Sequence, residues 1–239
     1  MVTRDDVLRE LKLAPLWRLR RPGASSASEA GAARADGDAE PRRARIASLD
    51  FDALVADIAQ CRACGLSATR RRTVPGVGAR DAAWMFVGEA PGADEDAQGE
   101  PFVGAAGMLL DDMLAALGLA RGEGVFIANV LKCRPPNNRT PEPLEAAACR
   151  PYLDRQIELV APGLIVALGR SAACTLLRVD ASVASLRNRV HRYGKTPLIV
   201  TYHPAYLLRT PADKAKAWED LLFARRTLRE VAPVRAAPT

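Results

Sequence analysis

Four short apolar runs, separated by segments of helical character, constrain the fold of this chain more than any other feature. The runs cover residues 84–87, 125–130, 164–168 and 198–201. Each is short and continuous enough to predict a strand that is buried on both faces, and the segments between them are long enough for helical crossovers. The pattern therefore predicts an α/β protein, a three-layer α/β/α sandwich with a central four-stranded parallel sheet.

The two ends of the chain differ in composition from the segment that carries these runs. Residues 23–40 consist almost entirely of Ala, Ser, Gly, Asp and Glu, and such a stretch buries too little apolar surface to offset the entropy of ordering it. We expect a flexible extension over residues 1–45, which comprises a short possible helix within residues 6–20 and an Ala/Gly/Ser-rich linker. The globular domain is expected over residues 46–232, with its first helix capped at Ser48, and a tail over residues 233–239.

Composition excludes several classes of protein. Hydrophobic residues make up 49% of the chain, which excludes a wholly disordered protein. No run of about 18 apolar residues could cross a membrane, and the N-terminus lacks the apolar core of a secretory signal. A soluble, cytoplasmic protein without membrane contacts is expected. The net charge of +6, carried mostly by Arg, fits nucleic-acid binding, but the base composition of a genome explains an Arg excess equally well.

The carboxyl ends of the predicted strands are where a site is expected, because parallel strands end at the same edge of a sheet. The segments that reach this edge are residues 88–102, the stretch from Asn129 onward, residues 169–171 and residues 202–208. The first of these belongs to an expected loop over residues 88–107 and is rich in glycine and in carboxylates. Its acidity disfavours a triphosphate site, which would need a Lys near a helix N-terminus.

Several residues at this edge are candidates for the site, and most of them also have a structural interpretation. Asn129 lies in an apolar strand, and it is either a satisfied core amide or a reader of a base edge that offers a donor beside an acceptor. Phe102 is either core or a stacking platform for a base. His203 directly follows the last strand and is the stronger of the two histidines for chemistry. The apolar residues 206–208 beside Arg209 form either core or a wedge that enters a base stack while the arginine holds phosphate.

Four of the five cysteines are spaced as metal ligands are. Cys61 and Cys64 form a CxxC pair, and Cys133 and Cys149 can complete a four-sulfur site. Spacing alone leaves zinc and an iron-sulfur cluster about equally favoured, and four unrelated buried thiols are the less favoured alternative. Cys174 lies in an apolar helical segment and is expected to be a small core residue.

Four motifs in this order resemble those of the family 4 uracil-DNA glycosylases. They are GEAPG at residues 88–92, PFVG at 101–104, NVLKCRPP at 129–136 and HPAYLL at 203–208. The resemblance covers about residues 50–230 and does not extend to the first 45. It implies the glycosylase fold, a [4Fe-4S] cluster on Cys61, Cys64, Cys133 and Cys149, and a monofunctional enzyme of base excision repair that excises uracil from DNA.

The resemblance also implies roles for single residues. His203 would donate to the leaving uracil, Phe102 would stack on the flipped base and Asn129 would recognise its polar edge. Ala90 stands where the best-known uracil glycosylases have a water-activating Asp, so the general base is the least determined role. The complete expected set is catalytic His203, Glu95 and Glu89, substrate-binding Gly88, Ala90, Phe102, Asn129 and Asn137, and DNA-binding Ser171, Leu207 and Arg209.

Alternatives to a hydrolytic glycosylase are also defined by the sequence. A sister family that traps uracil covalently carries a basic insertion with a reactive His after the Asn129 strand, whereas this chain has CRPPNNR at residues 133–139. A non-catalytic module that binds DNA and recruits a repair partner is a second hypothesis, and a zinc protein acting on a nucleotide is a third. The expected partners are uracil-containing single- or double-stranded DNA and a protein that binds the N-terminal segment, with the chain itself a monomer.

Overall fold

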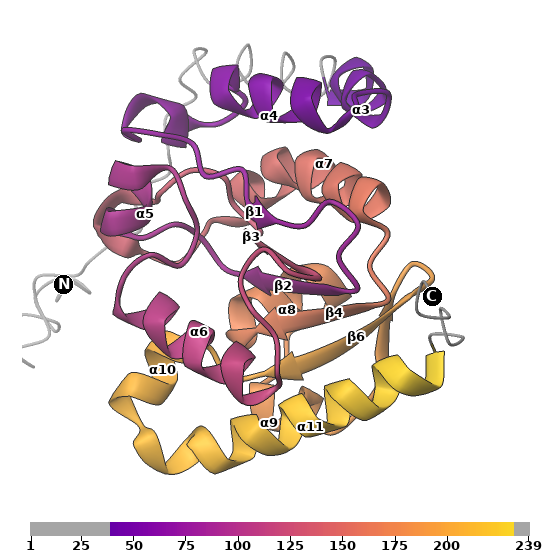
Figure 1. The fold of residues 1–239 in the computed structure, drawn as a ribbon. Helices are drawn as coiled ribbons and strands as arrows, with labels where there is room; N and C mark the ends of the chain where they lie inside the picture. The colour runs from indigo at the N-terminus through magenta and orange to yellow at the C-terminus, as the bar shows by residue number, and fades with distance from the viewer. Residues whose placement is uncertain (1–38, 232–239) are drawn as a thin grey trace, which may run out of the picture. The chain divides into compact units, whose positions relative to one another are not determined.

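The computed structural model describes residues 39–231, which contain a six-stranded sheet in the order β1-β3-β2-β4-β6-β5 (Figure 1). The strands are β1 (Val77–Gly78), β2 (Trp84–Gly88), β3 (Val125–Asn129), β4 (Leu164–Leu168), β5 (His191–Tyr193) and β6 (Thr196–Thr201). The four apolar runs form the central strands β3, β2, β4 and β6, which are parallel as expected. The edge strands β1 and β5, which lie outside the predicted four-stranded sheet, add antiparallel pairs on either side.

Helices cover both faces of this sheet, so the predicted three layers are present. They are α3 (Ala39–Ala47), α4 (Phe51–Gln60), α5 (Ala93–Gln98), α6 (Ala105–Ala116), α7 (Pro143–Val160), α8 (Gly169–Leu177), α9 (Val183–Leu186), α10 (Pro204–Arg209) and α11 (Lys214–Val231). Alternate residues of each strand point to opposite faces. Met85 and Val87 join the core beneath α4, α7 and α8, whereas Trp84 and Phe86 join the core beneath α6 and α11.

Two local expectations were wrong. Asp50, not Ser48, caps the first predicted helix, because its carboxylate accepts from Ala53 N at 2.8 Å. Ser48 instead accompanies the end of α3, where its hydroxyl donates to the Arg45 carbonyl. The glycine-rich segment after β2 is not entirely loop, since it contains α5.

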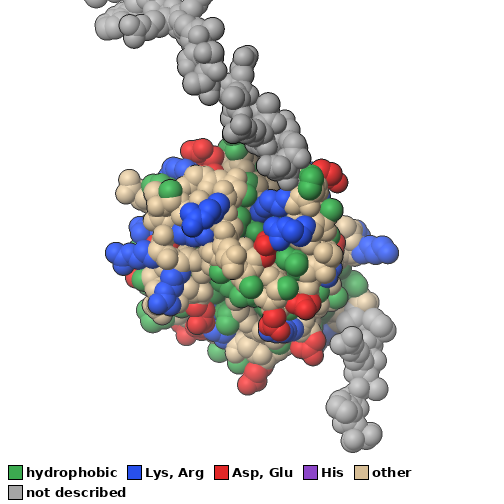
Figure 2. Space-filling model, turned by 90° about the horizontal axis from the view of Figure 1, so that it is seen from above, with side chains coloured by type: hydrophobic (Ala, Val, Ile, Leu, Met, Phe, Trp, Pro, Cys, Tyr) green, Lys and Arg blue, Asp and Glu red, His purple; other side chains and the backbone are tan. Residues whose placement is uncertain are grey.

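The expected boundary at residue 45 falls inside α3, and the last two residues of the expected linker belong to that helix. The other features expected before residue 39, and the whole of the expected tail, lie outside the described residues. No described helix is both long and apolar enough to cross a membrane. On the side that carries α3, α4 and α7, the surface bears Lys and Arg side chains interspersed with Asp and Glu (Figure 2).

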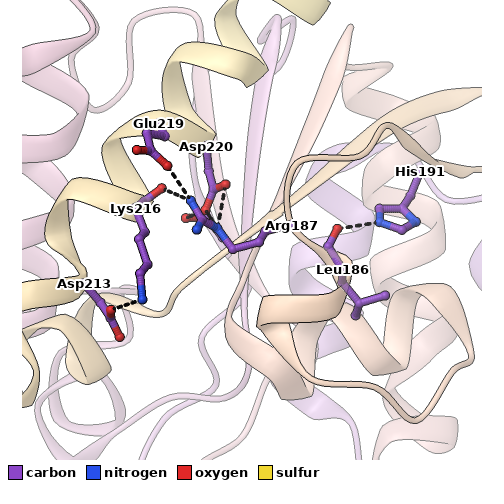
Figure 3. A network of polar contacts seen from close by, with 8 residues as sticks. Leu186, Arg187, His191, Asp213, Lys216, Glu219 and Asp220 are labelled. Atoms are coloured by element: carbon purple, nitrogen blue, oxygen red, sulfur yellow. Dashed lines mark hydrogen bonds and ion pairs between the residues drawn. The ribbon is translucent and has the colours of Figure 1, made fainter.

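An ion-pair network ties α11 to the end of β6. The Arg187 Nε lies 3.0 Å from Asp220 Oδ1, and its Nη2 lies 3.2 Å from Glu219 Oε2 (Figure 3). Asp220 is fully buried and also accepts from the Thr201 hydroxyl at 2.9 Å. Because Thr201 is the last residue of β6, the network fixes the strand end that leads into His203.

Candidate active site

A cavity of about 460 Å³ opens at the carboxyl edge of the parallel strands, where the sequence places the site. Its walls come from the turns after β2, β3 and β6 and from the start of α6. It is lined by Glu89, Ala90, Pro91, Gly92, Glu95, Phe102, Ala106, Asn129, Pro135, Asn138, Arg139, Thr140, His203, Ala205, Tyr206 and Arg209. The structure therefore brings together seven of the eleven residues expected at the site outside the cysteines.

Phe102 and His203 form one wall of the cavity. Phe102 is buried, and its ring stacks on the His203 imidazole with 5.5 Å between ring centroids and 29° between planes. A flat ring at the edge of a cavity is a surface on which a planar base can stack. The ring is also packed tightly from behind, because a Cβ added to Gly88 would lie 2.6 Å from its Cζ atom.

The hydrogen bonds of His203 define its tautomer. His203 is the N-cap of α10, and its Nδ1 accepts from the Ala205 backbone N–H at 3.1 Å. A ring nitrogen that accepts carries no proton, so the neutral imidazole has its proton on Nε2. Burial, with a smaller contribution from the nearby Arg209 charge, lowers the pKa of His203 to about 4. At neutral pH the residue is therefore an uncharged donor through Nε2.

Asn129 carries an unsatisfied acceptor. The side chain is 2% exposed, and its Oδ1 has no hydrogen-bond partner among residues 39–231. Asn129 pairs with Gly88 across the strands, and a Cβ at Gly88 would lie only 2.4 Å from this oxygen. Leaving a buried acceptor without a donor costs about 1 to 3 kcal/mol. The amide is thus poised for a ligand that provides the missing hydrogen bond.

Two carboxylates of the first loop face the cavity in different environments. Glu89 is half-buried, and desolvation raises the pKa of its carboxyl group. A hydrogen bond with the adjacent Ser171 hydroxyl offsets part of this rise. Both oxygens of Glu95 are instead occupied by backbone groups. Its Oε2 accepts from Gly92 N at 2.9 Å, and its Oε1 accepts from Val103 N at 3.1 Å. Glu95 therefore joins the turn before α5 to the turn before α6.

The chain matches the family model described as the uracil DNA glycosylase superfamily over residues 75–222. It is 49% identical over 169 residues to a type-4 uracil-DNA glycosylase of Archaeoglobus fulgidus, with 67% of this chain and 84% of that protein covered. A type-4 uracil-DNA glycosylase of Thermotoga maritima is 45% identical over 161 residues, with 66% and 83% covered.

The chain belongs to the type-4 uracil-DNA glycosylases. The resemblance inferred from the four motifs is thereby confirmed. Similarity to the neighbouring type is weaker, since a type-5 uracil-DNA glycosylase of Thermus thermophilus is 30% identical over 191 residues, with 65% of this chain and 87% of that protein covered.

Two expected site residues of this glycosylase are placed differently from the prediction. Leu207 is 1% exposed, because its face of α10 turns into the core, so it cannot serve as a wedge in this conformation. Leu208, the next residue, is 43% exposed. Asn137 is exposed but does not line the cavity, whereas Asn138 does, because the chain turns tightly there with positive φ at both residues.

Ser171 and Gly88 do not line the cavity, although Ser171 is adjacent to Glu89 and Gly88 is adjacent to Phe102. Sequence reasoning also missed several polar residues that line the cavity, among them Tyr206 and Arg139. Tyr206 donates from its hydroxyl to Asp213 at 2.6 Å and was considered only as core or wedge. Arg139 had no distinguishing signal in a segment that contains several basic residues, yet it lines the cavity after β3.

The four expected ligand cysteines of the glycosylase surround a second, small cavity. Cys61 and Cys64 are half-buried, Cys133 and Cys149 are buried, and all four line the same space. No three His, Cys, Asp or Glu side chains in the described part of the chain converge as ligands of one metal ion. In an iron-sulfur cluster, by contrast, the thiolates surround a body with several irons.

Hydrogen-bond donors point at these sulfurs, as anionic ligands require. Arg70 Nη1 lies 3.0 Å from Cys133 Sγ, and the Lys132 backbone N–H lies 3.2 Å from Cys149 Sγ. Burial raises the pKa of the Cys149 thiol to about 12. A thiol in this environment ionises only if a cation binds it, so the donor set fits a metal or cluster ligand.

Replacement of Asn129 by Leu tests the unsatisfied acceptor. Leu has a similar shape and needs no hydrogen bond, so we expect the free energy of unfolding in urea to stay constant or to rise by about 1 kcal/mol. Uracil excision should fall sharply in the same variant. Gln156 is a buried amide that does not line the cavity, so Gln156→Met should keep excision. A destabilised Asn129→Leu protein with unchanged excision would contradict the assignment.

Proposed function

We propose that this protein hydrolyses the N-glycosidic bond of deoxyuridine in DNA, releasing uracil and leaving an abasic site. The observation that carries the proposal is one cavity in which an unsatisfied amide, a flat aromatic ring and a neutral imidazole donor meet. Membership of the type-4 uracil-DNA glycosylases supports it independently. The cytoplasmic location, the monomeric state and an N-terminal protein partner stay predictions.

Base recognition begins with rotation of the deoxyuridine out of the helix, at a cost of a few kcal/mol. Stacking of the base on Phe102 offsets part of this cost. Asn129 Oδ1 accepts from the N–H on the polar edge of uracil, and the amide donates to the adjacent carbonyl. Cytosine presents an acceptor at the corresponding ring nitrogen, so the same amide orientation disfavours it.

Bond cleavage leaves negative charge on the departing uracil. The Nε2–H of His203 donates to the oxygen on which this charge develops. A neutral imidazole is suited to this role, because it stabilises the anion by donating a hydrogen bond. It does not have to be protonated to an imidazolium at neutral pH. The Nδ1 cap on α10 keeps the donor directed at the cavity.

The sugar develops positive charge in the same step, and we assign its stabilisation to Glu89. This carboxylate lines the cavity and is held in a poorly solvated place, where an ionised group acts more strongly than in water. It also orients the attacking water. Glu95 has a positioning role, because both of its oxygens already accept from the loops that frame the cavity.

DNA contacts surround the mouth of the cavity. Leu208 and Arg209 are exposed at the end of α10, and we assign the wedge to Leu208 and a phosphate contact to Arg209. Ser171 stays a predicted DNA contact. A wedge next to an arginine fills the gap left by the rotated base while the phosphate on that strand is held.

Cys61, Cys64, Cys133 and Cys149 would hold a [4Fe-4S] cluster. When bound, the cluster supplies covalent links between the end of α4, α7 and the segment after β3. These links add to hydrogen bonds such as that from the Tyr152 hydroxyl to Asp57, which joins α7 to α4. The segment after β3 also supplies Pro135, Asn138 and Arg139 to the wall of the main cavity. The cluster site thus stabilises part of the substrate cavity without touching the substrate.

Replacement of His203 by Asn tests the leaving-group role. Asn is a good N-cap, so α10 is retained while the Nε2 donor is lost. We expect the single-turnover rate on an oligonucleotide with one uracil to fall about 100-fold or more, with DNA binding kept. The strand is cut with alkali and resolved on a gel, with a thymine strand as control. A rate within about twofold of the unchanged protein would exclude the role.

Metal analysis tests the cluster. The anaerobically purified protein should be brown and contain about four irons per chain, and Cys133→Ala should lose iron, colour and thermal stability together. Cys174 hydrogen-bonds to the Ala181 carbonyl and does not line the cysteine cavity, so Cys174→Ala is the matched control and should keep all three. One zinc and no iron in the colourless protein would refute the cluster.

A further inference from the structure

Phe102 adopts an unusual backbone conformation for a residue with a large side chain. Its φ is 56°, in the left-handed region, where a side chain other than glycine costs roughly 1 to 2 kcal/mol. The residue is nonetheless buried at the wall of the cavity. Surrounding contacts must therefore hold it in this conformation.

Arg121 holds the carbonyl side of this turn. Its Nη1 donates to the Pro101 carbonyl at 2.8 Å, and its Nη2 donates to the Phe102 carbonyl at the same distance. Asp111 accepts from the guanidinium at 3.0 Å, and Glu100 lies 3.6 Å from it. A planar guanidinium can grip two successive carbonyls in this way, whereas an ammonium has no such fork.

Two further contacts close the turn from the other side. A Cβ on Gly107 would lie 1.7 Å from the Phe102 carbonyl oxygen, so only glycine lets α6 approach so closely. Glu95 accepts from the N–H of Val103, the residue that follows Phe102. The carbonyl and the next N–H of Phe102 are thus both fixed, and the direction of its ring is fixed with them.

We propose that Arg121 is a positioning residue for the base-stacking surface of this enzyme. It does not line the cavity, and it acts only through the backbone of Phe102, keeping the ring against His203 and ready for a planar base. The inference rests on the proposed stacking role of Phe102. Without Arg121 the strained turn would relax, and the ring would leave the position in which it meets uracil.

A double-mutant cycle tests this inference in the full-length protein. We expect Arg121→Met to lower kcat/KM for uracil-containing DNA about tenfold or more, and Phe102→Ala to lower it at least as much. Combining the two should add no further loss, because Arg121 has no ring left to position. Arg121→Lys, which can still reach one carbonyl, should recover part of the activity. Arg80, whose exposed ion pair with Asp52 is remote in sequence from these turns, provides the control Arg80→Met.

Thermal unfolding separates positioning from a merely structural effect. Arg121→Met should lower Tm by a similar amount with or without the Phe102 ring, while its effect on kcat/KM should require the ring. Equal losses of kcat/KM in both backgrounds, or no loss in the background with Phe102, would overturn the inference. If Phe102→Ala alone left excision unchanged, the proposed stacking role would fail, and the positioning role with it.

Discussion

Parallel pairing of β3, β2, β4 and β6 is the constraint on which the rest of the structure depends, because it brings four strand ends to one edge. Gly88 pairs with Asn129, and Leu168 pairs with Thr201, so the segments that follow these residues start side by side. The absence of a side chain at Gly88 lets the Asn129 amide and the Phe102 ring pack against the β2 backbone. Residues far apart in the sequence thereby line one cavity.

The chemistry of that cavity depends on a neutral histidine. Capping of α10 by Nδ1 fixes the proton on Nε2, and burial keeps the ring uncharged well below neutral pH. The Arg187 network secures the end of β6 immediately before this residue. Folding stability contributed by neutral His203 is lost as the pH falls from the ordinary histidine range toward 4, since the unfolded chain takes up a proton first.

The features of the fold and the site that depend on hydrophobic periodicity and on the positions of the strand ends could be predicted from the sequence. The four central strands, the three layers and the gathering of Glu89, Phe102, Asn129 and His203 at one edge follow from short apolar runs and the polar residues after them. Strands β1 and β5 have two and three residues, too few for a periodic pattern. Leu207 is buried and its neighbour Leu208 is exposed because of how α10 is rotated about its axis against the core. Tertiary packing determines this rotation, so the sequence does not reveal it. Arg121 acts through backbone carbonyls, so no motif marks it.

Nuclear magnetic resonance of the histidine ring nitrogens tests the central claim, that His203 acts as a neutral donor through Nε2. The chain contains two histidines, so His191→Gln leaves a single set of signals to follow with pH. The account predicts a proton on Nε2 and a bare Nδ1 at pH 7, with protonation of Nδ1 only near pH 4. A proton on Nδ1 at pH 7, or an imidazolium that forms at the ordinary histidine pKa, would contradict it.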